Sequence, residues 1–205
     1  ISNTAYAAAS IKSHLVTVKP QYTPAGEVGK NDLLPCQSDS APFRCYGPGQ
    51  IRRAYDIQRV LAEGIKGAGN TIVIIDAFQS PTIRQDLNLF DRVFRLHQPR
   101  LNIIAPDGLT PFDPGNPIQV GWSAEISLDV EWAHAIAPDA TIDLVLARDS
   151  QDTSILSVTK YAIDNNLGDV ISQSFGEAES CMDPQLMSLQ HLAFREATKK
   201  GITLL

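Results

Sequence analysis

The sequence has little positive charge and no long apolar run. Its 17 lysine and arginine residues are outnumbered by 23 aspartate and glutamate residues, which gives a net charge of -6. A protein that binds a phosphate backbone normally presents a basic face, so no nucleic-acid partner is expected. No apolar run approaches the roughly 18 residues that span a bilayer. The sequence therefore predicts a soluble protein without a membrane partner.

Cysteine is also scarce, and the spacing of the three cysteines matches no zinc site. Cys36 and Cys45 bracket a short loop, and in an oxidising compartment we expect them to form a local disulfide. Cys181 would then pair with a group outside this chain. Three unconnected thiols are the alternative. The four histidines are scattered without metal spacing, so no metal ligand is predicted in this chain.

Several familiar catalytic and cofactor motifs are missing. The sequence contains no G-x-S-x-G, no H-E-x-x-H and no phosphate-binding loop. The glycines of GAGNTI precede an expected strand, whereas phosphate binding needs glycines between a strand and a helix, so we interpret them as a turn. The S-x-x-K of residues 157–160 lies on an amphipathic helix without its companion motifs. A doubly wound cofactor-binding protein is therefore not favoured.

An alternation of strands and helices follows residue 46. Runs such as TIVIID, LNII and TIDLVLA predict buried strands, and the stretches between them predict helices, the first over residues 50–63. Repeated strand and helix units predict an α/β fold, with a parallel sheet covered by helices on both faces. Residues 1–45 are expected to form a linker or wrapping arm before the core at 46–205. The final GITLL begins an expected buried strand whose edge would be unpaired in this chain alone. An exposed edge of this kind is unstable, so we expect a longer protein.

One predicted helix, within residues 122–140, carries two carboxylates one turn apart. At about 100° per residue, Glu125 and Asp129 share a stripe inside the apolar arc of the helix. Glu131 and His134 fall on the opposite side, which is the expected solvent face. Burial of two like charges is costly unless a proton or hydrogen bonds relieve it, so the pair invites a chemical explanation. An ordinary exposed pair of acids is the alternative.

Two strand ends carry further candidates. Asp76 ends the first buried strand, at the carboxyl edge where sites in open α/β sheets gather, although a capping or loop-ordering role is equally consistent with the sequence. S-x-S-F-G ends a later strand, and the backbone of Ser174, Phe175 and Gly176 could pair with an extended peptide. A plain strand terminus is the alternative there.

Taken together, these residues resemble the sedolisin family, the serine-carboxyl peptidases with a subtilisin-like fold. Tyr46-x-Pro48-x-x-Ile51-x-x-x-Tyr55 is similar to the start of the catalytic domain in that family. The likeness continues through TIVIID, E-x-x-x-D and S-x-S-F-G to the end of the chain. The resemblance implies a subtilisin-like parallel sheet with helices on both faces, which this chain would contain only in part.

The resemblance also implies roles for the candidate residues. Glu125 corresponds to the general base of a nucleophilic serine, and Asp129 to the residue that orients this base. Ser174, Phe175 and Gly176 correspond to the turn that lines the substrate cleft. Members often carry tryptophan where Phe175 stands, so this chain lacks a side-chain hydrogen bond there.

The nucleophile of the family lies in a G-T-S motif, which this sequence lacks. The oxyanion-stabilising aspartate and the calcium ligands of the family are likewise expected outside this chain, in the remaining C-terminal half of the domain. The resemblance thus predicts a secreted, calcium-containing endopeptidase with a polypeptide substrate. A relative that binds peptides without cleaving them is the alternative.

An acid working range fits these residue types. A general base must be unprotonated, and free glutamate titrates near pH 4.3 against about 6.5 for histidine. Coupling between Glu125 and Asp129 would split their titration into two steps, with one proton held between them.

Overall fold

A five-stranded sheet forms the centre of the molecule in the structure, a computed structural model that describes residues 19–20 and 45–205. Its strands lie in the order β3-β4-β2-β5-β7, and every neighbouring pair is parallel. The strands are β2 (Thr71–Ala77), β3 (Arg100–Ile104), β4 (Thr141–Ala147), β5 (Val170–Ser172) and β7 (Thr203–Leu204). The predicted parallel sheet is confirmed.

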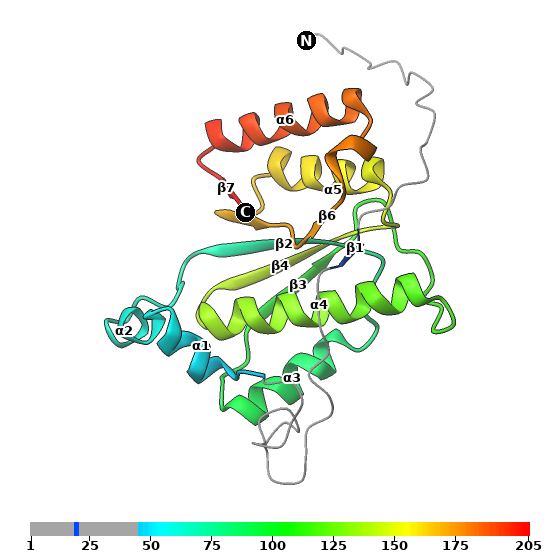
Figure 1. Ribbon diagram of the computed structural model, residues 1–205. Coiled ribbons are helices and arrows are strands. Elements are labelled where there is room, and N and C mark those ends of the chain that lie inside the picture. Colours follow the sequence, from blue (N-terminus) through cyan, green and yellow to red (C-terminus); the bar gives the residue numbers. More distant parts are fainter. Residues whose placement is uncertain (1–18, 21–44) are drawn as a thin grey trace.

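Helices cover both faces of this sheet, as the sequence predicts. Figure 1 shows α5 and α6 on one face, and α3 and α4 on the other. The helices are α1 (Pro48–Ala54), α2 (Ile57–Ala62), α3 (Ile83–Phe94), α4 (Pro117–Ile136), α5 (Asp152–Asp164) and α6 (Pro184–Lys199), with a short 3-10 helix at Glu179–Cys181. No helix within the described residues combines the length and apolar character that a bilayer span requires.

The single helix predicted over residues 50–63 is wrong, because the chain forms two short helices there. Asp56 separates them with a φ of 57°, in the left-handed region that ends a right-handed helix. Tyr55 closes the first helix through its backbone N–H, which donates to the carbonyl oxygen of Ile51. A side chain that tolerates left-handed backbone allows this break without a glycine.

The core has two layers because β2 is buried on both faces. Val73 and Ile75 join the apolar cluster under α5 and α6, while Ile74 joins the cluster under α3 and α4. Successive side chains of a strand point to opposite faces, so a strand between two helical layers needs apolar residues at every position. This requirement explains the unbroken run TIVII in the sequence.

Helix α4 is the longest described helix, and both of its ends have clear causes. Asn116 caps its first turn, where the side-chain oxygen accepts hydrogen bonds from the backbone N–H groups of Ile118 at 3.0 Å and Gln119 at 3.4 Å. Pro117 occupies the first helical position, where its missing N–H costs nothing. The helix packs against β2 and β4 on one side and against α3 on another. It therefore holds its side chains in fixed positions under the sheet.

A second, two-stranded sheet lies beside the main one. Its strands are β1 (Lys19–Pro20) and β6 (Phe175–Gly176), which pair antiparallel with Lys19 opposite Gly176 and Pro20 opposite Phe175. Strand β7 is one edge of the five-stranded sheet, and β3 is the other.

The cysteines and the N-terminal arm are only partly within the described residues. Cys45 is disulfide-bonded, and Cys36 lies outside the described residues, so their pairing stays a prediction. Cys181 is free and exposed. The predicted arm at residues 1–45 also lies outside, except for Lys19–Pro20 and Cys45.

Candidate functional site

Three carboxyl groups lie close enough to interact electrostatically near the carboxyl end of β2. Asp76, near the end of this strand, is 0% exposed, and Glu125 on α4 is 1% exposed. Burial raises the pKa of Asp76 well above its ordinary range, and the charges of Asp129 and Glu125 raise it further. The structure therefore brings Asp76 to the acidic pair predicted from the sequence. Its place at a strand end was the signal, but the sequence left a capping role equally open.

Asp129 connects the acids to the segment that follows β5. The hydroxyl of Ser174 donates a hydrogen bond to its carboxylate. Burial raises the pKa of Asp129 to about 6, and the Ser174 hydrogen bond partly opposes this rise because it favours the ionised form. Asp129 thus changes its protonation state between acid and neutral pH.

These three acids can hold and exchange a proton. Two of them have raised pKa values, since low-dielectric surroundings and neighbouring like charges both disfavour ionisation. Groups coupled in this way lose their protons in steps that belong to the cluster as a whole. Such a cluster suits general acid–base chemistry at acid pH.

Aromatic packing links α4 to the S-x-S-F-G segment. Trp122 lies one turn before Glu125, is fully buried, and places its ring centroid 5.9 Å from that of Phe175. The packing fixes Phe175 relative to the acidic helix. Ser174 therefore contacts Asp129, and Phe175 and Gly176 follow it in the chain as β6.

The edge of β6 can hold an extended segment, because β1 already pairs with it. Antiparallel backbone pairing needs no particular side chain, and it is a common way to bind peptides. The segment that bonds Asp129 through Ser174 thus continues directly into the strand that pairs with β1.

The predicted solvent face of α4 is wrong. His134 is 0% exposed, with its Nε2 2.7 Å from the carbonyl oxygen of His97 and 3.2 Å from Oδ1 of Asp91. Burial, together with the charges of Asp86 and Asp91, raises the pKa of Glu131 to about 7. The reason is that α3 packs over this side of α4, which a helical wheel of α4 alone cannot reveal.

Calcium is expected from the resemblance, with its ligands outside this chain. Among the described residues, no group of three or more histidine, cysteine, aspartate or glutamate side chains is placed to hold a metal ion. The calcium site outside this chain therefore stays a prediction.

No family model matches the sequence. Kumamolisin from Bacillus sp. strain MN-32 is 27% identical over 173 residues, which is 82% of this chain and 30% of that protein. The predicted resemblance to the sedolisin family is confirmed. This chain thus spans less than a third of the length of that relative.

A solved structure has the same fold. Pseudomonas sedolisin, a serine-carboxyl proteinase determined with two molecules of pseudo-iodotyrostatin, matches with a TM-score of 0.63 and 22% identity. The match covers 78% of this chain and 43% of that sedolisin chain. The subtilisin-like α/β fold predicted from the sequence is confirmed for this part of the domain.

Proposed function

We propose that this chain carries the acid–base half of an endopeptidase site that works at acid pH, with a serine nucleophile from outside the chain. The observation that carries the proposal is the buried cluster of Asp76, Glu125 and Asp129 beside the peptide-pairing edge of β6. The likeness to kumamolisin and to sedolisin supports a peptidase.

In the proposed reaction, Glu125 is the general base. Its carboxylate takes the proton of the serine hydroxyl while the serine oxygen attacks the carbonyl carbon of the peptide bond. The protonated Glu125 then gives this proton to the leaving amine nitrogen, which releases the first product and leaves an acyl-enzyme. A water molecule hydrolyses the ester after Glu125 removes its proton, and the serine regains a proton from Glu125.

Asp129 is proposed as the residue that positions Glu125, and Asp76 as a third acid that supports both. Asp129 lies one turn after Glu125 on a rigid helix, and the Ser174 hydroxyl fixes its carboxylate. Asp76 is buried against the pair, so its proton responds to their charges. Raised pKa values keep Asp76 and Asp129 largely protonated at acid pH, so these two groups can donate hydrogen bonds to Glu125 when it acts as the base.

The substrate is proposed to be an extended polypeptide that pairs with β6, through the backbone of Ser174, Phe175 and Gly176. The pairing of β1 with this edge supports it. We further propose a secreted protein, which the disulfide at Cys45 supports because such bonds persist in oxidising compartments. Calcium and the C-terminal half of the domain are proposed to complete the enzyme.

The test replaces Glu125 with glutamine in the complete protein that carries this chain. Glu131→Gln is the matched control, since it makes the same change on the same helix at a partly buried position. Loss of a general base is expected to slow peptide cleavage by about 10²–10⁴-fold. The control is expected to keep its activity. Cleavage by the Glu125→Gln protein at the native rate would refute the assignment of the base.

A non-catalytic peptide binder is the second candidate. The pairing of β1 with β6 favours it, because backbone pairing can hold an extended segment at this edge without cleavage. Binding of a peptide to the complete protein without any turnover, from acid to neutral pH, would favour this candidate over the peptidase.

A further inference from the structure

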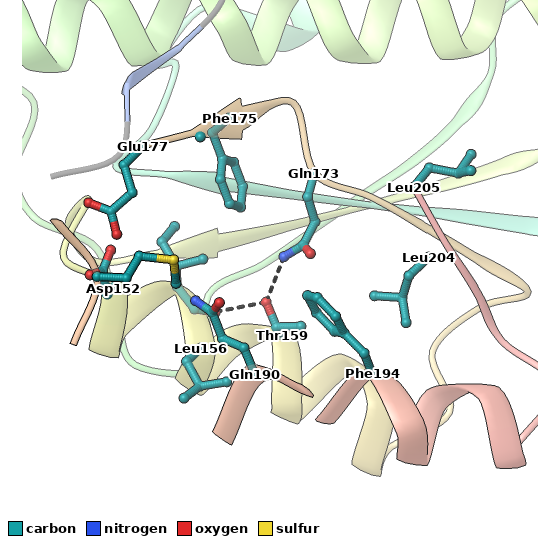
Figure 2. Close-up of a pocket in the computed structure, with 13 residues that line it drawn as sticks. Asp152, Leu156, Thr159, Gln173, Phe175, Glu177, Gln190, Phe194, Leu204 and Leu205 are labelled. Carbon is teal, nitrogen blue, oxygen red and sulfur yellow. Dashed lines mark hydrogen bonds between the residues drawn. The ribbon is translucent and has the colours of Figure 1, made fainter. Parts of the chain in front are cut away.

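A cavity opens next to β6 on the opposite face of the sheet from α4. It has a volume of about 380 Å³ and lies between α5, α6 and the segment that contains β6. We call it the β6 pocket. Figure 2 shows that its labelled residues come from these elements and from β7, with Phe194 and Leu204 together at one end and Asp152 and Glu177 at the other.

The walls and the far end of the β6 pocket differ in chemistry. Leu156, Phe175 and Phe194 contribute apolar surface along its length. Asp152, the first residue of α5, and Glu177, which directly follows β6, are its charged lining residues. A cavity with apolar side chains on its walls and carboxyl groups at one end is complementary to a side chain with a methylene stem and a positive head.

The carboxyl groups of Asp152 and Glu177 are hydrogen-bond partners of each other. Their side chains share a hydrogen bond, which requires a proton because ionised carboxylates only accept. Burial raises the pKa of both groups, and the charge of Asp152 adds to the rise at Glu177. In the described part of the chain, no nitrogen or hydroxyl donor reaches Oδ1 of Asp152 or either carboxyl oxygen of Glu177. The pair therefore has hydrogen-bond acceptor atoms and negative charge to which no cation among the described residues binds.

The β6 pocket adjoins the strand that pairs with β1. Phe175 and Gly176 line it, and the same two residues pair with the extended segment β1. Side chains of an extended peptide alternate between two faces, so every second side chain of a peptide on β6 points to the same side.

We propose that the β6 pocket binds a lysine or arginine side chain of a polypeptide that lies along β6. The methylene stem would pack against Leu156 and Phe194, and the cation would bind between the carboxyl groups of Asp152 and Glu177. This inference rests on the proposed function, because it names the class of substrate that the peptide edge selects.

The test compares peptides that differ only in one side chain. A single lysine, or a single norleucine of the same length without the charge, is moved along the part of a peptide that precedes the cleaved bond. For the complete protein, kcat/KM and the equilibrium Kd are measured for each member of the series. At one position, lysine is expected to be preferred over norleucine by about tenfold, the size of one charge-assisted hydrogen bond.

Two double variants decide whether the carboxyl pair causes this preference. Asp152→Asn with Glu177→Gln is expected to bring the lysine-to-norleucine ratio close to one. Asp164→Asn with Glu196→Gln removes the same net charge from an exposed position at the end of α5 and a partly exposed position on α6, and is expected to leave the ratio unchanged. If the first double variant does not fold, Glu177→Gln alone carries the test, with a smaller loss of preference.

The outcomes separate this inference from the proposed function. Equal values for lysine and norleucine at every position, or a preference that survives the loss of Asp152 and Glu177, would overturn the β6 pocket as a basic subsite. A lysine preference in Kd without any hydrolysis would support the pocket and refute the peptidase. Hydrolysis without a lysine preference would support the peptidase and refute the β6 pocket as a basic subsite.

Discussion

Replacement of Asp129 with asparagine is expected to change the stability of the protein in a pH-dependent way. Burial raises the pKa of Asp129 to about 6, and the Ser174 hydrogen bond only partly opposes this. An unfolded aspartate titrates near 3.9, so the folded state disfavours the ionised form by about 3 kcal/mol. Asparagine has nearly the same shape and can still accept a hydrogen bond from Ser174, but it carries no charge.

The direction in which stability changes with pH depends on whether the folded or the unfolded state holds the proton of Asp129. Below about pH 4, Asp129 is protonated in the folded and the unfolded protein, so burial carries no charge penalty. Between about pH 4 and pH 6, the unfolded state loses its proton while the folded state keeps it, and stability falls as the pH rises. Above about pH 6, the folded state also ionises and the penalty is complete. The variant avoids this loss.

Urea unfolding at about pH 3.5 and about pH 7.5 measures the effect. The free energy of unfolding of Asp129→Asn should equal that of the native protein at the lower pH and exceed it by up to about 3 kcal/mol at the higher pH. Asp164→Asn, at an exposed position on α5, controls for the loss of one negative charge. A difference between Asp129→Asn and the native protein that stays the same at both pH values would refute the buried, proton-holding carboxyl.

Two further predictions concern the packing that positions the acids. Ile126→Ala, at a side chain that is 0% exposed beside Glu125, should cost about 2–5 kcal/mol of unfolding free energy, whereas Ile118→Ala, at an exposed position of α4, should cost less than about 0.5 kcal/mol. Gly168→Ala would place a Cβ 2.7 Å from the carbonyl oxygen of Thr71, and its thermal unfolding should show a loss of about 1–3 kcal/mol. Gly49→Ala, in the open first turns of α1, should instead raise stability by up to about 1 kcal/mol.

The fold was largely predictable because its signals are local. A strand buried on both faces is largely apolar along its length, as TIVIID and TIDLVLA are. Helical stretches between such strands predict a parallel sheet, even when the neighbouring strands are not known. The break at Asp56 was not predictable in this way. A residue other than glycine with left-handed backbone, such as Asp56, is only weakly indicated by its residue type.

The acidic pair on α4 was predictable for the same reason, since helical spacing places Glu125 and Asp129 on one stripe. The burial of His134 was not, because the wheel treats α4 as a surface helix and α3 covers the side that the wheel assigns to solvent. Asp76 was only half predictable, since its position at a strand end is visible but its neighbours come from a helix almost fifty residues later.

The sequence by itself determined the α/β class, the stripe of acids and the segment S-x-S-F-G, because each depends on residue type and short-range periodicity. Only the tertiary structure decided that Asp76 joins Glu125 and Asp129, that Ser174 bonds Asp129, and that Asp152 meets Glu177 in a pocket. These contacts join residues that are far apart in the chain. Their pKa values depend on burial and on neighbouring charge, which exist only once the strands and helices have packed together.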